Sequence, residues 1–183
     1  MNQEKDQVLV AHLAKQGIDD KMVNGHPAGL FVLFFTEMWE RFSYYGMRAL
    51  LTLFLIRTIA DGGWEWSNER AMKLYGAYTG FVYLTPLIGG MIADKLTGFK
   101  KAILIGALIM TLGHLSMAFE AVNSGFFFLG LLLMILGNGM FKPNISSMVG
   151  NLYPDKSAKK DAGYTIFYMG INAGSFLWML LCG

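Results

Sequence analysis

The sequence predicts an all-α membrane protein. Charged residues make up only 15% of its 183 residues and hydrophobic residues make up 54%, whereas about a quarter of the residues in a soluble domain are charged. The apolar residues come in long blocks that short polar connectors separate, as in a chain with several membrane-spanning helices. Most lysines lie in these connectors and form no basic face, so we expect no nucleic-acid partner.

Five apolar blocks are long enough to cross a bilayer core of about 30 Å. We expect helices at about 28–59, 71–93, 102–119, 125–152 and 161–183. Residues 1–27 are polar and predict a mobile N-terminal tail, with a short surface helix around Val8 to Ala14. The last block stops at Gly183 without a flanking charge or turn. We therefore expect the chain to be cut off during or just after a fifth helix, so that the helical bundle of residues 28–183 is incomplete at its C-terminus.

The connectors predict the orientation of the chain in the lipid bilayer. Lysines gather in the N-terminal tail and in the connectors 94–101 and 153–161, while the opposite connectors hold fewer positive residues. Because positive connectors stay on the cytoplasmic side, we expect a multi-pass protein of the cell's inner (plasma) membrane with a cytoplasmic N-terminus. Trp64 and Trp66 would then anchor an external loop at the membrane interface.

Small residues and prolines mark expected features inside the spans. Gly76 with Gly80, and Gly170 with Gly174, have the GxxxG spacing that is typical of close helix contacts. Pro86 and Pro143 interrupt the backbone hydrogen bonds of two predicted helices, so we expect kinks or unwound turns there.

The first predicted span carries four charged residues on one helical stripe. These are Glu37, Glu40, Arg41 and Arg48. A charge at the bilayer centre costs roughly 2.5 to 3.5 kcal/mol, so four cost on the order of 10 kcal/mol, while the apolar residues of this helix return only about 6 kcal/mol. The stripe must therefore face protein or a water-filled cavity, with Arg41 paired to the two glutamates.

The charged stripe has a purely structural interpretation and a functional one. Buried charges can pair only to fix the register of a helix. However, Arg48 has no acidic residue within four positions, and Lys142 lies deep in the fourth span between Asn138 and Asn144. Two such cations suggest an anionic ligand. A carboxylate beside Arg41 could exchange a proton, because small rearrangements of the pair would change its proton occupancy.

Three segments resemble motifs of the proton-coupled oligopeptide transporters, a branch of the major facilitator superfamily. EMWERFSYYG (37–46) resembles the motif ExxERFxYYG, and YTIFYMGINAGSF (164–176) is similar to the fifth-helix signature. GGMIADKLTGFKKA (89–102) resembles the signature of the second-to-third helix loop, with its G-x-x-x-D-K pattern at Gly90, Asp94 and Lys95.

The resemblance implies a role for each matching residue. Glu37, Glu40 and Arg41 would couple transport to protons, and Arg48 and Lys142 would hold the C-terminal carboxylate of a peptide. The peptide site would be lined by Tyr44, Tyr45, Tyr83 and Asn172, and the cytoplasmic gating loop would hold Gly90, Asp94 and Lys95. The fold implied is the N-terminal portion of a two-bundle transporter. The residues that bind the peptide's amino terminus would lie largely in the second bundle.

We therefore expect symport of protons with di- and tripeptides by alternating access, with protons as the coupling ion and no cofactor or metal. One alternative is a major facilitator transporter of another anion such as nitrate, which would need Lys142 but no intact glutamate trio. A second alternative is a membrane enzyme. The sequence offers it no HExxH motif, no GxSxG motif and no paired metal ligands within a span.

Overall fold

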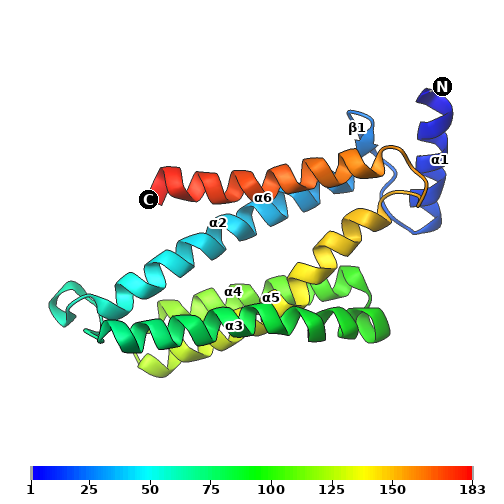
Figure 1. The fold of residues 1–183 in the computed structure, drawn as a ribbon. Coiled ribbons are helices and arrows are strands. Elements are labelled where there is room, and N and C mark those ends of the chain that lie inside the picture. The colour runs from blue at the N-terminus through cyan, green and yellow to red at the C-terminus, as the bar shows by residue number, and fades with distance from the viewer. Residues whose placement is uncertain (1, 183) are drawn as a thin grey trace. The chain divides into compact units, whose positions relative to one another are not determined.

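The computed structural model describes residues 2–182, which are almost entirely helical (Figure 1). Met1 and Gly183, the two ends of the predicted domains, lie outside the described residues. The order of elements is α1 (Asn2–Lys15), β1 (Met22–Val23), β2 (His26–Pro27), α2 (Ala28–Ile56), η1 (Ile59–Asp61), α3 (Asn68–Ile92), η2 (Ala93–Thr97), α4 (Phe99–Ala118), α5 (Ser124–Asn151) and α6 (Lys160–Cys182).

The ends of α2 to α6 lie within about three residues of the expected boundaries. Among the described residues, four helical segments are long and apolar enough to cross a membrane: Asn68–Thr97, Phe99–Ala118, Ser124–Asn151 and Lys160–Leu181. Helix α2 is 29 residues long. It is not one of these four segments, because it contains four charged residues. The expectation that α2 also spans the membrane stays a prediction.

The chain divides into two compact units. The first unit contains the residues up to Ala49 and those from Met148 onward, and the second contains Leu50–Ser147. Helices α2 and α5 therefore each contribute to both units.

In the first unit, α2 and α6 run side by side (Figure 1). Their contact is close because Gly170 lies against Phe34 and Gly174 lies against the backbone of Met38. The GxxxG spacing thus correctly predicted a close helix contact in α6. At Gly46, the glycine belongs to α2 and the large side chain to α6. The indole of Trp178 occupies the space that a side chain at position 46 would need.

The N-terminal tail of the first unit is more ordered than the sequence suggested. Helix α1 buries Leu9 and Leu13, which are 2% and 0% exposed, and His12 Nε2 lies 3.1 Å from the carbonyl oxygen of Asn151. A two-residue turn at Asn24-Gly25 follows, with positive φ at both positions, and joins β1 to β2 as a hairpin. The expectation of a mobile tail is therefore wrong for this segment, which packs on the end of α5.

In the second unit, glycines bring α3, α4 and α5 close together. Gly106 and Gly113 of α4 face Gly137 and Gly130 of α5, a spacing of seven residues on each helix. Between α3 and α5, the backbones meet at Gly89 and Gly139. In membranes, such small residues allow the backbone contact that drives helix association.

The expected close contact at Gly76 and Gly80 is not present within the described residues, since a Cβ at either position would have no neighbour within 4 Å. Helices α3 and α5 continue through Pro86 and Pro143 without an unwound turn, and the kinks expected at these prolines stay a prediction. The irregular backbone lies instead in η2, a π-helical turn that ends at Gly98 with a φ of 74°.

Candidate functional site

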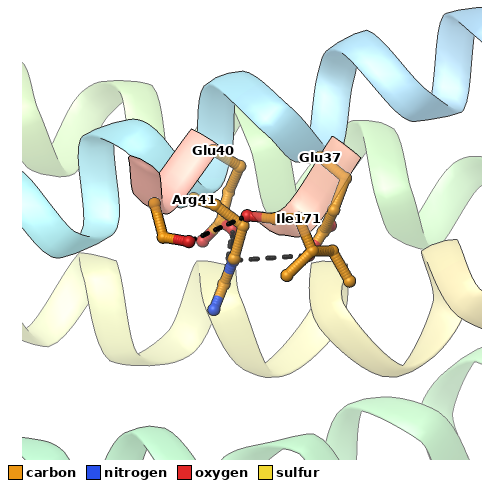
Figure 2. A network of polar contacts seen from close by, with 5 residues as sticks. Glu37, Glu40, Arg41 and Ile171 are labelled. Atoms are coloured by element: carbon orange, nitrogen blue, oxygen red, sulfur yellow. Dashed lines mark hydrogen bonds and ion pairs between the residues drawn. The ribbon is translucent and has the colours of Figure 1, made fainter. Parts of the chain in front are cut away.

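The predicted ion cluster forms in the first unit (Figure 2). Arg41 Nε lies 3.3 Å from Glu37 Oε1 and 2.5 Å from Glu40 Oε2, and a second guanidinium nitrogen also pairs with Glu40. Glu37 and Arg41 are 2% and 4% exposed. The cluster arises because Arg41 follows Glu37 by one helical turn and Glu40 by one residue. As expected, its side chains are covered by protein.

Helix α6 packs against this cluster at Gly174, where a Cβ would lie 3.0 Å from Arg41 Cβ. Figure 2 draws Ile171 of α6 in the same view as the cluster. The hydroxyl of Ser175 is turned back onto its own helix, where it donates to the carbonyls of Ile171 and Asn172 at 3.3 and 3.0 Å. Because Glu37 and Arg41 are almost fully buried, charge–charge attraction is stronger here than at a wet surface.

The ring of Tyr44 lies next to two arginines. The guanidinium carbon of Arg41 is 4.7 Å from the ring centroid and that of Arg48 is 5.4 Å from it. Tyr44 is 3% exposed, and its ring meets that of Tyr45 edge to face at 5.5 Å. Sequence reasoning treated Arg48 as a cation without a partner, which is wrong, because an aromatic face is a partner for a cation.

In the second unit, Lys142 is half-buried and also faces an aromatic ring. Its Nζ lies 5.5 Å from the ring centroid of Tyr83, which is 61% exposed. The flanking Asn138 and Asn144 are 2% and 1% exposed, and Asn144 Nδ2 donates to the carbonyl of Met140 at 2.6 Å. Lys142 therefore also has a partner that its sequence neighbours did not reveal.

The remaining predicted residues are distributed over both units. Asn172 is exposed on α6. Asp94 and Lys95 are exposed in η2, and Gly90 lies at the end of α3, where its Cβ position is 3.8 Å from the ring of Pro143. Arg48 belongs to the first unit and Lys142 to the second, so their expected joint binding of a carboxylate stays a prediction, as do the roles of all these residues.

Small residues position the charged ones, and sequence reasoning identified Gly174 but missed Gly89 and Gly139. Gly174 sets the distance between α6 and Arg41, and Gly89 with Gly139 sets the α3–α5 contact near Tyr83 and Lys142. For Gly89 and Gly139, the only signal in the sequence is the glycine itself, whose partner depends on the tertiary fold. Among the described residues, no group of three or more His, Cys, Asp or Glu side chains could hold a metal ion.

Comparisons with known proteins agree on one family. The family model described as "POT family" matches residues 100–183. The peptide transporter YePEPT of Yersinia enterocolitica is 48% identical over 160 residues, which cover 87% of this chain and 31% of the relative. A di-/tripeptide transporter of Lactococcus lactis subsp. lactis is 44% identical over 166 residues, which cover 90% of this chain and 33% of the relative.

A solved structure agrees with these relatives. The crystal structure of a peptide transporter POT in complex with sulfate superimposes with a TM-score of 0.86 at 40% identity, covering 96% of this chain and 35% of that one. The chain thus spans about a third of the length of the curated relatives that it matches. The chain matches the POT family, and its long apolar helices have the fold of the matched part of this peptide transporter structure.

Proposed function

We propose that this chain is the N-terminal part of a transporter that moves di- and tripeptides together with protons by alternating access. The observation that carries the proposal is the buried cluster of Glu37, Glu40 and Arg41. Two carboxylates that share one guanidinium away from water form a site where a single added proton changes the balance of charge. The names of the relatives support peptides as the substrate, and none of those quoted above points to nitrate.

Protons act as the coupling ion in this proposal. A proton that enters from solvent binds one carboxylate of the cluster, and the attraction of that group for Arg41 weakens. Because the cluster couples α2 to α6 through the Gly174 contact, the two protonation states favour different helix arrangements, and the proton gradient drives the change between them. No bond of the peptide breaks, so the proposal describes a transporter without enzymatic activity or cofactor.

Arg48 and Lys142 hold the peptide's C-terminal carboxylate in this proposal. Guanidinium and ammonium groups recognise carboxylates by charge-assisted hydrogen bonds, and both side chains are only half-buried, so a ligand can reach them. Tyr44, Tyr45, Tyr83 and Asn172 line the site, while Gly90, Asp94 and Lys95 belong to a cytoplasmic gate. The N-terminus is on the cytoplasmic side of the plasma membrane, and the missing C-terminal helices supply the contacts to the peptide's amino end.

The test uses the complete transporter in liposomes. Glu40→Gln should abolish dipeptide uptake that a proton gradient drives, while peptide counterflow, which needs no gradient, continues. Glu69→Gln is the matched control, because the side chain of Glu69 is 78% exposed and pairs only at the surface with Lys73. Equal loss of uptake and counterflow in Glu40→Gln would mean that Glu40 is structural.

Two further measurements separate the alternatives. Di- and tripeptides should compete with the labelled dipeptide, and nitrate should not. Mass spectrometry of the liposome contents should find the dipeptide intact, whereas cleaved peptide without accumulation of intact peptide would indicate a membrane enzyme.

A further inference from the structure

Tyr44 joins two parts of the molecule that the proposed function treats as separate. Arg41, in the ion cluster, precedes it by three residues, and Arg48, the proposed carboxylate-binding residue, follows it by four. On one helix, positions three and four residues apart lie on the same face. The two guanidiniums therefore converge on one ring, at 4.7 and 5.4 Å from its centroid.

The ring offers both arginines an attraction that they cannot offer each other. Two guanidiniums repel, and the repulsion grows as water is removed. The face of an aromatic ring carries negative charge density and attracts a cation within about 6 Å of the centroid. Since Tyr44 is 3% exposed, water screens these contacts little. The ring thus connects the position of one guanidinium to that of the other.

The two arginines differ in burial. Arg41 is 4% exposed and is bound by Glu37 and Glu40, whereas Arg48 is half-buried. A change in the carboxylates therefore acts first on Arg41. Any movement of Arg41 toward or away from the ring therefore changes the strength of the attraction between the ring and Arg48.

Building on the proposed function, we propose that Tyr44 is a positioning residue that transmits the protonation state of the Glu37–Glu40–Arg41 cluster to Arg48. When a proton binds one carboxylate, Arg41 loses part of its ionic attraction and relies more on the face of Tyr44. Arg48 is then held less firmly by the same ring, and its guanidinium becomes available to the carboxylate of the peptide. Proton binding thereby raises the affinity for peptide, which is the order of events that symport requires.

The test compares two substitutions of Tyr44 in the complete transporter. Tyr44→Leu removes the aromatic face, and Tyr44→Phe keeps it but removes the hydroxyl. The KM of dipeptide counterflow is measured between about pH 5.5 and about pH 8, with no gradient. The wild-type protein should show a lower KM at acidic pH. In Tyr44→Leu this pH dependence should flatten, with a KM at acidic pH about tenfold above the wild-type value, because cation–π contacts of buried rings have this strength.

The controls separate this role from packing and from contacts of the Tyr44 hydroxyl. Tyr44→Phe should retain the pH dependence of KM. Phe167→Leu, at a 0% exposed aromatic residue of α6 in the same unit, should lower thermal stability while the pH dependence stays. If Tyr44→Leu does not fold, Tyr44→Met replaces it, because methionine fills the space without an aromatic face.

Three results would overturn the inference. The first is a wild-type pH dependence of KM in the leucine or methionine variant. The second is equal flattening in Tyr44→Phe, which would assign the effect to the hydroxyl. The third is a wild-type transporter that moves no peptide. This result would overturn the proposed function itself, and it is distinguishable because it is seen in the wild-type protein, before any substitution is made.

Discussion

The two units each hold a cation, buried in the first and half-buried in the second, and they hold it in different ways. In the first unit, Arg41 is neutralised by Glu37 and Glu40, which lie within four residues of it on the same helix. In the second unit, Lys142 of α5 faces the ring of Tyr83 on α3. The first arrangement is local and uses opposite charge. The second is tertiary, and depends on how two helices pack.

The contact between Lys142 and Tyr83 forms only where α3 and α5 pack closely. Thr85 of α3 donates from Oγ1 to the carbonyl of Ile135 on α5 at 3.1 Å, and Asn144 Nδ2 lies 3.4 Å from the carbonyl of Gly89. Gly89 and Gly139 leave no room for a side chain between the backbones. The cation of the second unit is therefore held by packing, and that of the first unit by ion pairs. This difference can be tested by substitution.

The largest effect is expected when Arg41 is removed. Arg41→Met leaves two neighbouring carboxylates buried without their cation, which should cost about 3–5 kcal/mol of stability. Thermal unfolding of the purified transporter in detergent measures the loss. Lys73→Met is the control, because Lys73 is 75% exposed and its ion pair with Glu69 should contribute less than about 1 kcal/mol. Similar losses in both variants would contradict the importance of the local ion pairs.

The second effect concerns the α3–α5 contact. In Gly89→Ala, the new methyl group would meet the carbonyl group of Gly139, which as backbone cannot turn aside, and we expect a loss of about 1–3 kcal/mol. In Gly80→Ala, on the same helix, the methyl group meets nothing within 4 Å, so the higher helix propensity of alanine should stabilise the chain by up to about 1 kcal/mol. The same thermal unfolding measurement compares the two. A larger loss at position 80 than at position 89 would show that this packing is misassigned.

The same contrast explains what the sequence could predict. The ion cluster was predictable because its three members lie within one helical turn, and the helix ends were predictable from long apolar blocks. The ring partner of Lys142 was not, because Tyr83 is 59 positions away and only the glycine contact of α3 with α5 brings it near. Local periodicity carries no information about which faces of two helices meet.

The GxxxG pairs show this limit directly. Gly170 with Gly174 and Gly76 with Gly80 have the same spacing, yet only the α6 pair meets another helix within the described chain.

The hairpin in the N-terminal tail is a different case. The Asn24-Gly25 signal for a two-residue turn was present in the sequence, but a tail with many charges concealed it. Likewise, Leu9 and Leu13 are four residues apart, which indicates one apolar face of α1.

The third effect is smaller and concerns the ring beside Lys142. Tyr83→Leu removes the aromatic face, and because a cation–π contact at a partly exposed site is worth about 0.5–1 kcal/mol, we expect the KM for dipeptides to rise about two- to fivefold. Tyr83→Phe keeps the face and should recover most of the affinity. Counterflow at constant pH measures both variants. Equal KM values for Tyr83→Leu and the wild-type protein would mean that the ring does not position Lys142.

The smallest effect concerns His26, an ionisable side chain that the fold holds in its neutral form. His26 Nδ1 lies 2.8 Å from the hydroxyl of Tyr153, and Lys159 Nζ donates to the carbonyl of Gly25 at 2.8 Å. Burial, and then the positive charge of Lys159, lower the pKa of His26 below its ordinary value of 6.5. Burial raises the pKa of Tyr153 to about 12, so the phenol keeps its proton and can donate it to neutral His26.

The sign of the pH dependence follows from these two shifts. The unfolded segment binds a proton at His26 near pH 6.5, and the folded segment binds it only at lower pH. The stabilisation is therefore complete above about pH 6.5 and is lost as the pH falls from there through the lower pKa of the folded segment. Hydrogen–deuterium exchange of residues 22–27, corrected for the intrinsic pH dependence, should show faster opening at about pH 5 than at about pH 7.5. His26→Asn can bond to Tyr153 without titrating, so its opening should not change with pH. If it changes as in the wild-type protein, a group other than His26 controls the packing of the tail.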